Sequence, residues 1–71
     1  MKVFYDKDGN VVGMIDSATP AIEAKMTMAD RLESRVPSPI AERLRNPNDP
    51  LLHTDLAVED GRVIVANPDR L

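Results

Sequence analysis

The same alternation of β-prone runs and turn residues occurs near both ends of the chain. Residues 2–15 hold two β-prone runs around Asp8-Gly9, and residues 55–66 hold two around Asp60-Gly61. Glycine accepts the positive φ that a tight turn demands, so Asp-Gly between such runs is typical of a hairpin. The pattern therefore predicts two β-hairpins, at about 2–15 and 55–66.

The first hairpin, with strands at 2–5 and 11–15, allows two registers. A three-residue loop with Gly9 in the left-handed region would pair Tyr5 with Val11, whereas a two-residue loop would pair Tyr5 with Val12. Gly13, inside the second strand, indicates a bulge or a close backbone approach.

Residues 20–35 carry an ambiguous pattern. Thr19 and Pro20 suit the cap and first position of a helix. Residues 22–28 alternate strictly between apolar and polar, which favours a half-buried strand. A helical face is interrupted only by Glu33, and good helix formers dominate the segment. We expect a helix over about 20–35; its apolar face would comprise Ile22, Met26, Ala29 and Val36.

Residues 36–52 form a Pro-rich middle, since four of the six prolines fall within 37–50. Ser38 and Pro39 resemble a helix cap and first position, so we expect a short helix over 39–45. The rest of the segment is predicted to be extended or turn-like. The whole chain is therefore interpreted as one small α+β domain, residues 1–71.

Size and composition point towards partners. A chain of 71 residues buries only about 60% of the surface that it exposes when unfolded. There is no Cys, one His and two aromatic residues, so disulfides, thiolate metal sites and a large aromatic core are excluded. Oligomerisation or docking onto another protein is the remaining support.

Charge and hydropathy narrow the class of partner. The net charge is −3, and both signs are interspersed along the chain, which argues against nucleic acid as the main partner. No apolar run approaches the roughly 20 residues of a membrane span. We therefore expect protein partners, either subunits of a larger assembly or copies of the chain itself, and neither nucleic acid nor membrane.

The candidate partner-binding residues are apolar and lie in the middle segment or in the last strand. The β-branched run 63–65 suggests burial on both faces or pairing with another chain. Leu51 and Leu52 follow a run of turn residues, with little local structure to bury them, so we expect them to be buried against a neighbour or against the second hairpin. Proline lowers the entropy lost on docking. The predicted set is Val36, Ile40, Leu44, Leu51, Leu52, Val63, Ile64 and Val65.

Two patterns suggest chemistry, and neither is favoured. Residues 6–10 resemble the start of an EF-hand calcium loop, but the position that needs Gly holds Val11, so a hairpin turn is the better interpretation. His53 is the one candidate general base, with Asp55 nearby and Ser38 or Thr54 as a conceivable nucleophile. No Gly-rich loop or nucleophile elbow accompanies them, so we expect no catalytic residue, no metal and no cofactor.

The opening Met1-Lys2-Val3-Phe4-Tyr5-Asp6-Lys7-Asp8-Gly9-Asn10, together with the Pro-rich middle, resembles small accessory proteins of tailed-bacteriophage virions. The resemblance implies a head-decorating, connector or tail-associated structural role without catalysis or cofactor. It implies location in a virion; otherwise a cytoplasmic location is expected. The alternative function is a small acidic regulatory or inhibitory module that docks on a bacterial protein.

Overall fold

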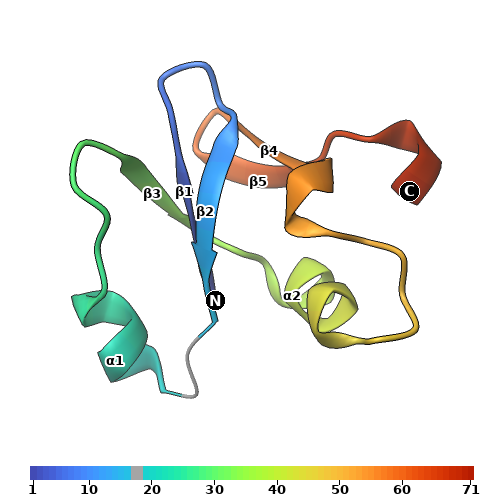
Figure 1. Ribbon diagram of the computed structural model, residues 1–71, viewed down its shortest axis with the longest axis horizontal. Coiled ribbons are helices and arrows are strands. Elements are labelled where there is room, and N and C mark those ends of the chain that lie inside the picture. Colours follow the sequence, from blue (N-terminus) through green and yellow to red (C-terminus); the bar gives the residue numbers. More distant parts are fainter. Residues whose placement is uncertain (17–18) are drawn as a thin grey trace.

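The computed structural model describes residues 1–16 and 19–71 and has an α+β fold, as predicted (Figure 1). In chain order its elements are β1 (Lys2–Tyr5), β2 (Val11–Ile15), α1 (Pro20–Lys25), β3 (Leu32–Arg35), α2 (Ser38–Arg45), the 3-10 turn η1 (His53–Asp55), β4 (Leu56–Glu59), β5 (Arg62–Val65) and the 3-10 turn η2 (Pro68–Arg70).

The first hairpin and β3 form a three-stranded antiparallel sheet with the order β2-β1-β3, in which β1 is central. Tyr5 pairs with Val11, as the three-residue loop predicts, and Gly9 has a φ of 85°. A bulge at Val12 then brings Phe4 opposite Gly13. The bulge expected at Gly13 therefore occurs next to it, whereas the part of the chain close to Gly13 is a side chain rather than a backbone: a Cβ there would lie 2.9 Å from the Met28 side chain.

The second hairpin, β4–β5, has a two-residue turn. Asp60 and Gly61 both have positive φ, 53° and 75°, which is the type I′ geometry that suits the twist of a tight hairpin. The first hairpin holds it through its own turn, since the Val58 N–H donates to the Gly9 carbonyl at 2.8 Å. Figure 1 shows β4 and β5 crossing the upper part of β2.

The main core lies between this second hairpin, one face of the three-stranded sheet, and α2. Because residues alternate along a strand, Val63 and Val65 face the core with Leu56 and Val58, while Ile64 faces the other way. The buried cluster consists of Val3, Val36, Ala41, Leu51, Leu56, Val58 and Val63.

The opposite face of the sheet has a smaller apolar centre. Phe4 is 1% exposed there, and Met28 packs beside it over Gly13. The Lys2 ammonium lies 5.4 Å from the centre of the Phe4 ring and donates to the carbonyl of Met26. The segment after α1 therefore covers this face.

The predicted helix over 20–35 is wrong beyond Lys25. Thr19 caps the helix as expected, but the helix ends after six residues, and Leu32–Arg35 forms β3. The alternative strand over 22–28 does not form either. Backbone hydrogen bonding explains the result: β1 is buried and needs a partner on each edge, and this requirement outweighs the small differences in helix propensity.

The Pro-rich middle largely follows its prediction. The short helix α2 begins one residue before the expected 39–45, with Pro37 rather than Ser38 at the cap, and without a side-chain cap hydrogen bond. The turn that follows is closed by a hydrogen bond of 3.1 Å from the Asp49 N–H to the Asn46 carbonyl, and Arg43 pairs with Asp49 at 3.0 Å.

Candidate functional site

The outer edge of β3 carries backbone groups that the sheet does not use. The Val36 N–H donates to the Met1 carbonyl at 3.0 Å, so these two residues form a hydrogen-bonded pair. In an antiparallel ladder such pairs alternate with non-bonded ones. With Lys2 opposite Arg35 and Phe4 opposite Glu33, the N–H and C=O groups of Glu33 and Arg35 must point outward.

This edge is open to solvent. β3 makes its main contacts with β1 and β5, and three of its four residues are exposed. Among the described residues, the backbone hydrogen bonds outside the helices and strands include none to Glu33 or Arg35. Unpaired strand edges of this kind are templates for another strand.

The side chains along the edge differ in how they are held. The Glu33 carboxylate accepts a hydrogen bond from Lys2 at 3.2 Å, and a hydrogen bond with the Thr27 side chain is the main cause that lowers the pKa of Glu33. The Ser34 hydroxyl donates to the Gly61 carbonyl at 2.8 Å on the core face. Arg35 forms no ion pair within the described part of the chain.

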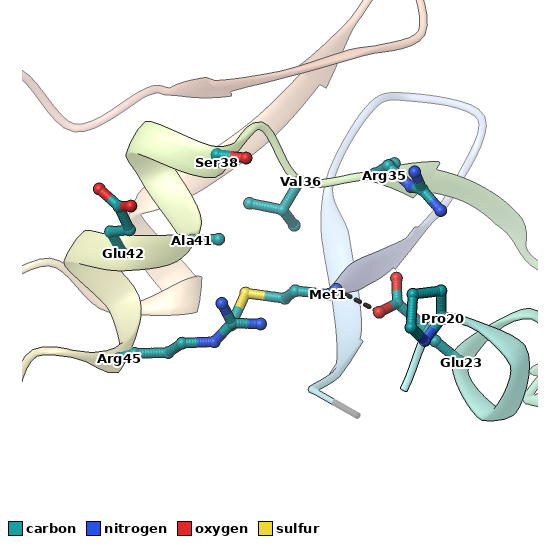
Figure 2. Close-up of a pocket in the computed structure, with 9 residues that line it drawn as sticks. All are labelled: Met1, Pro20, Glu23, Arg35, Val36, Ser38, Ala41, Glu42 and Arg45. Carbon is teal, nitrogen blue, oxygen red and sulfur yellow. Dashed lines mark hydrogen bonds and ion pairs between the residues drawn. The ribbon is translucent and has the colours of Figure 1, made fainter. Parts of the chain in front are cut away.

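Two clefts border this edge. One, of about 300 Å³, lies between β3 and α1 and is lined by Lys2, Glu23, Ala24, Glu33, Ser34 and Arg35. The other, of about 260 Å³, lies between α1, the end of β3, and α2 (Figure 2). Glu23 and Arg35 line both clefts, so an extended segment laid along β3 would find recesses for its side chains.

Ion pairs fix the walls of the second cleft. The amino group of Met1 pairs with Glu23, the one buried residue of α1. Figure 2 shows the Met1 side chain extending from there toward α2. On the far wall Arg45 of α2 pairs with Asp16 at 2.8 Å, and this guanidinium lowers the pKa of Asp16. The helices are thus tied to the strands between them.

The structure places most of the predicted partner-binding residues in the chain's own core. Val36, Leu51 and Val63 are buried, and Ile40, Leu44 and Val65 pack against them. Leu51 is 2% exposed and belongs to the core cluster that holds residues of the second hairpin, which was one of the two expected places for its burial. Leu52 is 55% exposed, and Ile64 is half-buried on the outer face of β5. The role of the set in partner binding stays a prediction.

Sequence reasoning missed β3 because it assigned the segment to a helix. Two signals were present: Glu33 interrupts the proposed apolar face of that helix, and Pro37 favours extended backbone just before it. In the strand β3, Glu33 lies opposite Phe4 and on the same face of the sheet as Lys2, with which it forms an ion pair. A polar interruption of a helical face thus marked a strand edge.

The Asp6 loop is a turn, as expected. The Asp6 carboxylate accepts hydrogen bonds from the N–H groups of Asp8 and Asn10, at 2.9 and 3.0 Å, and the Asn10 bond is the first cause that lowers the pKa of Asp6. Residues 1–16 and 19–71 contain no group of three or more His, Cys, Asp or Glu side chains arranged to hold a metal ion.

The conceivable catalytic residues lie in two elements: His53, Thr54 and Asp55 form η1, and Ser38 begins α2. The Asp55 carboxylate accepts hydrogen bonds from the Leu52 N–H and the Asn67 amide, each at 2.9 Å, and the Asn67 bond is the main cause that lowers its pKa. His53 is exposed in η1. Ser38 lines the cleft in Figure 2, and His53 is not among the residues that line this cleft.

Comparison of the chain with known protein families, curated proteins and solved structures finds no match. None of the helices in the described ranges has the length and apolar character needed to cross a membrane.

Proposed function

We propose that this protein is a non-enzymatic structural subunit of a multi-protein assembly, which binds a neighbouring subunit by adding a strand to the outer edge of β3. The observation that carries the proposal is the outward-facing backbone of Glu33 and Arg35, on a strand bordered by two clefts. Main-chain hydrogen bonds would supply affinity, and the clefts would select alternate side chains.

The kind of assembly follows from the opening segment. Its resemblance to accessory proteins of tailed-phage virions makes a head-decorating, connector or tail-associated component the assembly that we propose. The composition supports a role that depends on a partner, because a chain of 71 residues with two aromatic residues has little core-filling mass and, without cysteine, no disulfide to stabilise it.

A matched pair of variants at Arg35 tests the edge. Arg35→Pro removes the outward N–H, while Arg35→Ala removes the same side chain but keeps the N–H. Proline is tolerated on a strand edge where the N–H faces solvent, so the pairing with β1 should survive in both. We expect Arg35→Pro to bind its neighbour about tenfold more weakly than Arg35→Ala, which is one lost hydrogen bond of about 1–1.5 kcal/mol.

Incorporation into the native particle, measured by co-purification from the source, is the readout, and thermal unfolding checks that both variants fold. Equal incorporation of folded Arg35→Pro and Arg35→Ala would exclude strand addition at β3. Recovery of the wild-type chain in a small complex of fixed stoichiometry, rather than a large particle, would favour the regulatory module.

A further inference from the structure

We infer that the strand added to β3 is β3 of a second copy of this chain, in antiparallel orientation about a two-fold axis at Ser34. The inference rests on the proposed function, because it names the occupant of the same edge. Its basis is that the outward-facing residues, Glu33 and Arg35, lie symmetrically on either side of Ser34 and carry opposite charges.

Three two-fold registers use these outward groups, and charge distinguishes them. Centring the axis on Glu33 places two carboxylates directly opposite each other, and centring it on Arg35 places two guanidinium groups opposite each other. Like charges at opposed positions are destabilising in a sheet, whereas opposite charges are favourable. Centring the axis on Ser34 puts Glu33 opposite the second copy's Arg35, and repeats that pair on the other side of the axis.

The backbone supports the same register. Glu33 and Arg35 of the two copies become hydrogen-bonded pairs, in which each pair exchanges both backbone hydrogen bonds. The Ser34 residues of the two copies lie opposite each other without exchanging backbone hydrogen bonds. This is the arrangement expected for Ser34, because its N–H and C=O groups are directed at β1. Pro37 lacks an N–H and ends the ladder just beyond, so the joined strands are short and the register is defined.

The side chains are available for this pairing. Arg35 has no ion pair in the described part of the chain, and the Glu33 side chain is 36% exposed although Lys2 contacts it. Both project from the face of the sheet that carries Lys2 and Phe4, since successive residues alternate between faces. The two three-stranded sheets would become one continuous antiparallel sheet, with the exposed edge of each copy covered.

Charge variants of Arg35 test the occupant without breaking an ion pair among the described residues. Sedimentation velocity over a concentration series should show a dimer for the wild type. Dimer affinity should fall about tenfold in Arg35→Gln and further in Arg35→Glu, which opposes two carboxylates. Thermal unfolding should be nearly unchanged in both. A wild type that stays monomeric up to its solubility limit, or an Arg35→Glu variant that dimerises as well as the wild type, would overturn the inference.

Mixing two variants provides the sharper measurement. Arg35→Glu has only acidic side chains at the paired positions, and Glu33→Arg has only basic ones, so neither should dimerise alone. A one-to-one mixture should form a heterodimer in native mass spectrometry, because every opposed pair then has opposite charge. If Glu33→Arg fails to fold after losing the Lys2 contact, the series of Arg35 variants alone decides.

Failure of the inference can be told apart from failure of the proposed function. If the wild type is monomeric and Arg35→Pro nevertheless loses binding to the native particle, the edge binds a different strand and only the second copy is wrong. If Arg35→Pro changes neither dimerisation nor incorporation, both proposals fall.

Discussion

The strand β5 contributes buried apolar side chains to the core, whereas β3 has the open backbone edge. The sequence pattern predicts that residues 63–65 in β5 are either buried or paired with another chain. β5 is the more apolar, with Val63, Ile64 and Val65, and it directs two of these side chains into the chain's own core. β3 holds Leu32 and three polar residues, and it is largely exposed. Apolar content thus indicates burial within the chain, while position in the sheet decides which backbone remains free to bind.

The order of strands explains this difference. β1 is central and uses both of its edges, so the strands beside it are left with one open edge each. β5 pairs with β4 and lies over the core, where its apolar side chains are needed. Charged residues on an exposed edge limit unspecific pairing, and their pattern determines which strand can be added.

The largest effect should come from placing a charge on the core face of β5. Val63→Asp buries a carboxylate at a position that is 4% exposed and has apolar neighbours, so the free energy of unfolding should fall by more than about 3 kcal/mol. Ile64→Asp, on the outer face, should cost about 1 kcal/mol. Urea denaturation followed by circular dichroism measures both; equal losses would mean that β5 does not direct Val63 inward.

The next largest effect should be a difference in stability between alanine variants of the two Asp-Gly turns, because only the first turn holds β4 to the first hairpin. A Cβ at Gly9 would overlap the Val58 carbonyl oxygen, whereas nothing lies within 4 Å of a Cβ at Gly61. Gly61→Ala should cost only the backbone strain of positive φ, about 1–2 kcal/mol. Gly9→Ala should cost more than that, because β4 must also move.

Urea midpoints of the two glycine variants give this comparison directly. A Gly9→Ala variant that is as stable as Gly61→Ala would show that β4–β5 does not depend on the first turn. In that case the close packing of Gly9 would have no influence on the second hairpin.

The hairpins and α2 were predictable because their signals are local. Asp8-Gly9 and Asp60-Gly61 require positive φ at fixed positions, and Ser38 and Pro39 mark the start of α2 to within one residue. Such features depend on a few adjacent residues, so the chain around them is enough to specify the structure.

β3 was not predictable in the same way because its cause is distant. Residues 32–35 become a strand because β1, some thirty positions earlier, has an unpaired edge. The local signals at Glu33 and Pro37 weaken the helix but do not identify β1 as the partner strand. The burial of Leu51 has the same origin, since the core that covers it is assembled from both hairpins and α2. The candidate site, the outer edge of β3, depends on the order of strands in the sheet, which the local sequence does not specify.

The last and smallest effect concerns two carboxylates, one that anchors β5 and one on β3. Hydrogen bonds from Asn67 and Leu52 lower the pKa of Asp55, and hydrogen bonds with Thr27 and Lys2 lower that of Glu33. A lowered pKa in the folded state means that the stabilisation is complete above the ordinary carboxyl pKa, about 4, and is lost as the pH falls through the folded-state pKa. The free energy of unfolding should therefore decrease from about pH 5 downward.

Isosteric neutral variants separate the two contributions. Asp55→Asn and Glu33→Gln should each make the acid-side dependence of the unfolding free energy less steep. The Asp55 residue is 7% exposed, whereas the Glu33 side chain is 36% exposed, and salt screens exposed charges far more than buried ones. Added salt should therefore reduce the difference between Glu33→Gln and the wild type more than that between Asp55→Asn and the wild type. Equal salt sensitivity would contradict the assignment of Asp55 to a buried anchor and Glu33 to an open edge.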